Sequence, residues 1–150
     1  IFHDGKAGQR MAPADRAALH ALARAGEWLW IAGNHDRERP ADLPGSWHAT
    51  LRIGPLTFNH EPQPGAADGE IAGHLHPVAK VRGRGGGVRR RCVATDGRRA
   101  VLPAFGAYAG GLNVCDAAFA PLFAPTRPTA LMLGRARVYA VAGERLLPDA

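Results

Sequence analysis

A chain of 150 residues has the length of one domain and buries roughly two thirds of its unfolded surface, so a real core is expected. Its 46% hydrophobic and 21% charged residues are ordinary for a globular protein, and no stretch approaches the roughly 20 apolar residues that cross a membrane. With 19 lysines and arginines against 13 acids, the formal net charge of +6 favours polyanionic partners.

The first residues and the two cysteines bear on the cellular compartment. The start, Ile1-Phe2-His3-Asp4, has neither the basic nor the apolar region of a secretion signal. Cys92 and Cys115 are therefore expected to be buried reduced thiols, and the protein is expected to be cytoplasmic. Because the chain does not begin with methionine and starts in what looks like the middle of a motif, we also expect a segment upstream of it.

A helix and a strand are predicted in the first third of the chain. The helix spans 12–25, because Pro13 suits a first turn, Asp15 suits the positive N-terminal end and Gly26 is a natural stop. The continuous apolar run 28–32 then predicts a central strand that ends at a glycine.

Three further strands are predicted before residue 75. Residues 48–53 alternate like a half-buried strand, and Gly54-Pro55 turns the chain into a second strand over 56–59. The run 70–72 reads as a third, buried strand.

The segment from Lys80 to Arg99 is strongly basic, with eight lysines and arginines against the single acid Asp96. Strands over 89–95 and 99–104 are predicted to pair across the favoured turn Asp96-Gly97. A solvated basic hairpin explains this composition by itself. Phosphate contacts are the alternative if the neighbouring site cuts nucleic acid. The residues proposed for such contacts are Lys80, Arg82, Arg84, Arg89, Arg90 and Arg91.

The last third of the chain is expected to complete the core. Residues 102–106 and 110–112 read as irregular loop around a packed aromatic, and the proline-interrupted segment 119–128 is expected to cover the core. Residues 130–133 and 138–141 predict a final hairpin. Without an internal repeat or a linker, we predict a single domain over 1–150.

Histidine-containing stretches follow the predicted strands and carry the candidate chemistry. These stretches contain His3-Asp4, Asn34-His35-Asp36, His60-Glu61 and His74-Leu75-His76. Open α/β sheets gather ligands at the carboxyl ends of their strands, so we expect these side chains to converge there. Imidazole, amide oxygen and carboxylate are donors that first-row divalent metals accept. Any one histidine alone has a simpler reading as a hydrogen-bonded polar residue; together they predict a metal site.

The order Gly33-Asn34-His35-Asp36, then His60, then Gly73-His74-Leu75-His76 resembles the last three motifs of the calcineurin-like metallophosphoesterase superfamily. Ile1 to Asp4 looks like the tail of that family's second motif, and its first motif is absent. Within the superfamily, the chain is most similar to the bacterial ligase-associated DNA damage response endonucleases. This closer resemblance is carried by His60-Glu61-Pro62, by 73–77, and by 102–106 followed by 110–112.

The resemblance implies two divalent ions, expected to be manganese, with iron or zinc as alternatives. Asn34, His60 and His74 would bind one ion, and His76 would bind the other. The bridging carboxylate and the remaining ligands would come from the missing upstream segment, so the chain by itself is expected to be inactive.

The resemblance also implies catalytic roles for two histidines. His35 would lie over the phosphate, and His3 would assist or orient it. Asp4 and Asp36 would hold these rings through hydrogen bonds, or would only cap their own loops. Glu61 would act in the same indirect way or lie on the surface.

The predicted fold is an α/β/β/α sandwich of two mixed sheets, missing its first strand and N-terminal motifs. The predicted function is two-metal hydrolysis of phosphodiester bonds by a DNA endonuclease linked to repair, with DNA, a DNA ligase and a helicase as expected partners. A phosphatase or phosphodiesterase for small nucleotides is one alternative, and a non-catalytic nucleic-acid-binding or docking module is another. A basic surface leading to the metals would favour the DNA enzyme.

Overall fold

The computed structural model describes residues 10–35 and 42–149. The chain divides into two compact units, residues 1–51 and 52–150, which are described separately. Among the described residues, no helix is long and apolar enough to cross a membrane. The single-domain organisation stays a prediction.

The described residues of the first unit form a helix and two short parallel strands. Helix α1 (Pro13–Ala23) begins with the expected proline and buries Leu19, and it is slightly shorter than predicted. Strand β1 (Leu29–Ile31) pairs in parallel with β2 (Ser46–His48), with Trp30 opposite Trp47. Within the described residues β1 pairs with β2 alone, so a central position is not observed for it.

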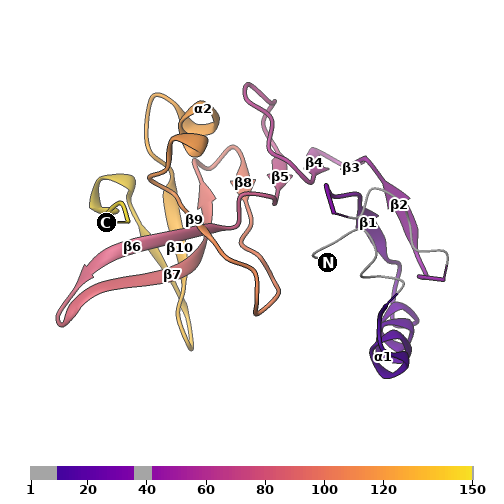
Figure 1. The fold of residues 1–150 in the computed structure, drawn as a ribbon. Helices are drawn as coiled ribbons and strands as arrows, with labels where there is room; N and C mark the ends of the chain where they lie inside the picture. The colour runs from indigo at the N-terminus through magenta and orange to yellow at the C-terminus, as the bar shows by residue number, and fades with distance from the viewer. Residues whose placement is uncertain (1–9, 36–41, 150) are drawn as a thin grey trace. The chain divides into compact units, whose positions relative to one another are not determined.

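The second unit is built on a mixed sheet (Figure 1). Its strand order is β11-β10-β7-β8-β5-β4-β3; β6 pairs with β7, and β9 pairs with β6. The bounds are β3 (Thr50–Ile53), β4 (Leu56–Asn59), β5 (Glu70–Ala72), β6 (Pro77–Gly83), β7 (Gly86–Thr95), β8 (Ala100–Val101), β9 (Leu112–Asn113), β10 (Thr129–Leu133) and β11 (Val138–Val141). The combination of helices with parallel and antiparallel strands confirms the predicted α/β sandwich class.

Strand β7 joins two parts of this sheet. Its first half, 86–91, pairs antiparallel with β6, and its second half, 92–95, pairs antiparallel with β10. The predicted pairing across Asp96-Gly97 is confirmed but short, because β8 contributes only Ala100 and Val101. The long β6–β7 hairpin, which projects from the unit in Figure 1, is the larger part of the basic segment.

The core lies between the sheet and a short helical segment. Here η1 (Ala117–Phe119) continues into α2 (Ala120–Phe123), and Phe119, Leu122 and Phe123 are buried against the sheet. The 3₁₀-helix η2 (Gly143–Arg145) follows β11. The predictions that 119–128 covers the core and that 130–141 forms a hairpin are therefore confirmed.

Two expectations need correction. The strand predicted over 48–53 is interrupted at Ala49, which separates β2 from β3. The prediction that 102–106 and 110–112 surround a packed aromatic is wrong, because Phe105 is 104% exposed. Tyr108, between the two runs, is 96% exposed. The loop that carries these two rings is rich in glycine and alanine and supplies little apolar surface to cover them.

Candidate metal centre

Three parallel strands end at one edge of the second unit's sheet. The register aligns Asn59 of β4 with Ala72 of β5, and Ala72 with Val101 of β8. Hydrogen bonds continue past the strand ends, from the Gly73 N–H to the His60 carbonyl at 2.9 Å and from the Leu102 N–H to the Ala72 carbonyl at 2.7 Å. The segments that begin at residues 60, 73 and 102 therefore leave the sheet side by side.

Two imidazoles meet at this edge. His74 Nδ1 lies 3.2 Å from His60 Nε2, and the two rings meet edge to face with their centroids 5.0 Å apart. Both side chains are half-buried. Two ring nitrogens at this distance either share one proton in a hydrogen bond or face a common cation.

The turn that follows β5 holds its histidines in an unusual backbone conformation. His74 has φ of 62° and His76 has φ of 49°, which places both in the left-handed region. The Leu75 N–H donates to the Gly73 carbonyl at 2.7 Å and tightens the turn. A residue with a β-carbon pays about 1 kcal/mol or more in this region, and such positions cluster at functional sites. The backbone therefore bends sharply between Gly73 and Pro77.

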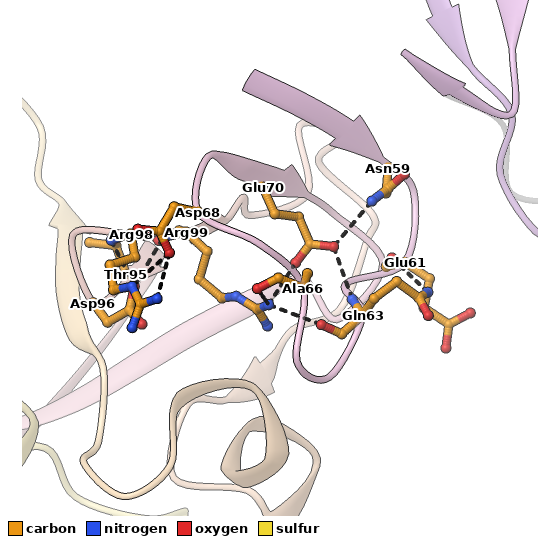
Figure 2. Close-up of polar contacts among 10 residues, drawn as sticks. All are labelled: Asn59, Glu61, Gln63, Ala66, Asp68, Glu70, Thr95, Asp96, Arg98 and Arg99. Atoms are coloured by element: carbon orange, nitrogen blue, oxygen red, sulfur yellow. Dashed lines mark hydrogen bonds and ion pairs between the residues drawn. The ribbon is translucent and has the colours of Figure 1, made fainter. Parts of the chain in front are cut away.

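A buried ion pair joins the starts of β5 and β8 (Figure 2). Arg99 Nη2 is 3.4 Å from Glu70 Oε2, and the two side chains are only 6% and 2% exposed. Glu70 Oε1 also accepts hydrogen bonds from Asn59 Nδ2 at 3.1 Å and from the Gln63 N–H at 3.0 Å. The carboxylate therefore links β4, β5 and the loop after His60.

The arginine completes this network from the other side. Arg99 Nη2 donates to the Gln63 carbonyl at 3.0 Å and to the Ala66 carbonyl at 3.2 Å. Figure 2 shows Glu70 and Arg99 pointing toward one another inside the curve of this loop. Because both flanks of His60 are tied to Glu70, the network limits where the His60 ring can move.

The histidine pair fits a divalent cation. Two nitrogen ligands about 2.1 Å from one ion, with about 100° between the bonds, lie about 3.2 Å apart. The pair supplies two nitrogen ligands and no more. Among residues 10–35 and 42–149, no three His, Cys, Asp or Glu side chains are grouped closely enough to share an ion.

The other predicted ligands and His35 come from two places in the described chain. Asn34 and His35 follow β1 in the first unit and are exposed. His76 lies in the same turn as His74, and its carbonyl accepts from the Leu112 N–H at 3.2 Å. The metal-binding roles of Asn34 and His76 and the catalytic role of His35 stay predictions.

The predicted indirect roles also stay predictions. His3, Asp4 and Asp36 lie outside the described residues. Glu61 is exposed, and its carbonyl accepts from Gln63 Nε2 at 3.2 Å.

The residues predicted to contact phosphate all lie on the β6–β7 hairpin: Lys80, Arg82, Arg84, Arg89, Arg90 and Arg91. Directly opposed residues of an antiparallel pair share a face, so Lys80, Arg89 and Arg91 lie on one face. Strand alternation adds Arg82 to this face, while Arg90 lies on the opposite one. Arg84 lies in the turn.

Glu70 and Arg99 are the supporting residues that the sequence reasoning missed. Glu70 opens a short strand that was predicted to be buried, and Arg99 follows the only acid of the basic segment. A charged residue inside a buried strand is a signal for a buried partner. The sequence does not show which of the many basic residues supplies it.

Comparisons with protein-family profiles and with curated proteins find no match. A solved structure is similar: the crystal structure of Pseudomonas putida nuclease MPE, with a TM-score of 0.61 and 28% sequence identity. The match covers 87% of this chain and 63% of the nuclease chain. The chain thus spans less than two thirds of the nuclease, and it shares that protein's α/β fold.

Proposed function

We propose that this chain carries the active-site edge of a metal-dependent phosphoesterase that cleaves phosphodiester bonds in DNA. The observation that carries the proposal is the His60–His74 pair, 3.2 Å apart at the carboxyl edge of parallel strands. The fold shared with a nuclease and the net charge of +6 support the same class of substrate.

Divalent ions, manganese first, would supply a hydroxide nucleophile at neutral pH and neutralise charge on the phosphate. His60 and His74 would hold one ion, with Asn34 as a further ligand and His76 on a second ion. The Glu70–Arg99 network would fix the His60 backbone, so that the two nitrogens stay at ligand spacing. The proposed role of His35 is to protonate the leaving oxygen.

The proposal is tested by a manganese-dependent cleavage assay on plasmid DNA with the complete gene product. His74→Ala is expected to lower the cleavage rate at least about 100-fold. Loss of a residue that only hydrogen-bonds a metal ligand already lowers metal affinity or activity by about 10–100-fold. His48→Ala is the matched control, because His48 lies on β2 and bonds Ser46 Oγ at 2.8 Å.

Equal cleavage by both variants would contradict the site assignment. Hydrolysis of small phosphomonoesters without cleavage of DNA would indicate a nucleotide phosphatase instead of a nuclease. DNA binding without turnover would favour a non-catalytic module.

A further inference from the structure

The loop of residues 102–111, here called the aromatic loop, presents two aromatic side chains to solvent. Phe105 is 104% exposed and Tyr108 is 96% exposed, the two highest values among the exposed large hydrophobic residues. Burial of a phenylalanine or tyrosine side chain is favourable, so a pair left fully exposed on one loop indicates a surface that binds something.

The backbone of the aromatic loop is fastened to β7. Arg91 Nη2 donates to the carbonyls of Gly106 at 2.7 Å, Ala107 at 3.3 Å and Ala109 at 3.2 Å. Arg89 Nη2 donates to the Gly111 carbonyl at 2.8 Å. The two rings therefore extend from a loop whose base is already ordered, which lowers the entropy lost on binding.

Both ends of the aromatic loop lie beside the histidine turn. The loop starts where the Leu102 N–H donates to the Ala72 carbonyl, directly before Gly73. It ends where the Leu112 N–H donates to the His76 carbonyl. Only glycine fits at 111, because a β-carbon there would lie 2.3 Å from Val78 Cγ1. The exposed rings are thus carried by the segment that spans from one flank of the histidine turn to the other.

Positive charge surrounds the aromatic loop. A shallow pocket of about 340 Å³ lies between Arg89, Arg90 and Arg91 of β7 and residues 109–111 of the loop. Lys80 and Arg82 continue the Arg91 face of the hairpin toward its tip. Asp149 is the acid that pairs with this surface, through Arg89 at 3.0 Å.

We propose that the aromatic loop and the adjacent basic face of the hairpin bind unpaired nucleotides of DNA, with bases stacked on Phe105 and Tyr108 and phosphates along the face that carries Lys80, Arg82 and Arg91. Aromatic rings beside a basic strand are the combination by which proteins bind single strands without sequence preference. A folded acidic protein would match the charge but would not need two separate, fully exposed ring faces. The inference rests on the proposed function and assigns the contact with unpaired nucleotides of its DNA substrate to the aromatic loop.

The test measures binding of a fluorescein-labelled oligothymidine of about 16 nucleotides by anisotropy, in EDTA, so that metal plays no part. Phe105→Ala and Tyr108→Ala are each expected to raise the Kd at least about fivefold, the loss expected for one stacked base. Tyr139→Ala is the matched control, since Tyr139 is 48% exposed on β11. Thermal melts should be unchanged, because the Phe105 and Tyr108 side chains contribute nothing to the core.

Two substitutions at one position separate stacking from general apolar contact. Phe105→Trp should retain the oligothymidine affinity, whereas Phe105→Leu should lose it. The proposal would be overturned if the unsubstituted protein did not bind the oligothymidine, or if Phe105→Ala and Tyr108→Ala bound it as tightly as the unsubstituted protein. It would also be overturned if Phe105→Leu kept the affinity of the unsubstituted protein. Full oligothymidine affinity in Phe105→Leu would indicate a general apolar contact instead of base stacking. Cleavage with manganese is scored separately, so binding without cleavage would refute the proposed nuclease and leave this surface standing.

Discussion

Two arginines that are adjacent in the chain form ion pairs in opposite surroundings. Arg98 pairs with Asp68 at 2.7 Å, and the two side chains are 73% and 65% exposed. Arg99 pairs with Glu70 at a longer 3.4 Å, with the two side chains 6% and 2% exposed. The first pair lies on the solvent side of the 63–69 loop, and the second lies beneath it.

The comparison teaches that distance is a poor guide to what an ion pair does. The exposed pair contributes little to stability, because its attraction is screened by water and replaces contacts with water. The hydrogen bond to Asp68 still raises the pKa of Arg98. The buried pair also bonds Asn59, Gln63 and Ala66, so its loss leaves charges and carbonyls unsatisfied in the interior. The buried side of the loop therefore holds the histidine edge in place.

The strongest way to break this comparison is to remove one arginine at a time. Arg99→Met should lower the free energy of unfolding by about 3–5 kcal/mol, because it leaves Glu70 buried without its partner. Arg98→Met, the matched control, should leave stability unchanged within error. Urea denaturation of the two variants measures both free energies of unfolding. Equal losses in the two variants would show that burial does not separate the pairs.

The two cysteines extend the comparison to reactivity. Burial raises the pKa of the Cys92 thiol to about 12, whereas Cys115 is half-buried at the surface. A rise of about three pKa units leaves about a thousandfold less thiolate at neutral pH, so native Cys92 should resist iodoacetamide. Mass spectrometry of the labelled chain should find Cys115 modified and Cys92 modified only after unfolding. Prompt native labelling of Cys92 would contradict the buried core.

The same thiol gives a prediction for alkaline pH. The folded pKa of Cys92 lies above its ordinary value of 9.0, so its contribution to stability is complete below pH 9. That contribution is lost as pH rises from 9 toward about 12, because the unfolded state then releases the proton more readily. Cys92→Ala should flatten the decline in melting temperature over this range, and an unchanged slope would refute the assignment.

A smaller effect is expected where the half-buried Arg91 orders a loop. Arg91→Met removes three hydrogen bonds to the aromatic loop but leaves no buried charge, so we expect a loss of about 1–2 kcal/mol. Hydrogen exchange over residues 103–110 should rise in this variant and stay unchanged in Arg90→Met. A loss as large as that of Arg99→Met would erase the distinction between the two arginines.

The smallest effect concerns the strained turn. His74→Gly should be more stable than His74→Ala by up to about 1 kcal/mol, because both variants lose the His60 contact and only glycine adopts a φ of 62° without a steric penalty. At His48 in β2 the order should be reversed, since glycine weakens a strand. Thermal melts compare the two pairs of variants. A His74→Gly variant that is less stable than His74→Ala would show that the turn is not strained.

Sequence patterns located the strands that carry the site. Strands β4 and β5 are short apolar runs bounded by glycine and proline, and the β10–β11 hairpin has the same signal. Strand β6 was missed, because Lys80 and Arg82 interrupt its apolar pattern and suggested a solvated segment. The pattern of residues 77–83 does not predict their pairing with β7, which forms only in the folded sheet.

The supporting residues of the site were harder to predict. The ligand candidates His60 and His74 follow recognisable strand ends, whereas Glu70 and Arg99 are far apart in the chain and meet only through the parallel pairing of β5 and β8. The two exposed aromatics carry no periodic pattern, so their apolar character wrongly suggested burial. Local signals identify strand ends, and tertiary pairing decides which charges are buried between them.

A manganese titration followed by NMR of the imidazole signals tests whether His60 and His74 bind one cation. His20 on α1 serves as the internal control in the same sample. We expect the His60 and His74 signals to broaden together at manganese concentrations that leave the His20 signal sharp. Broadening of all three signals at the same concentration, or of His60 without His74, would rule out a shared ion.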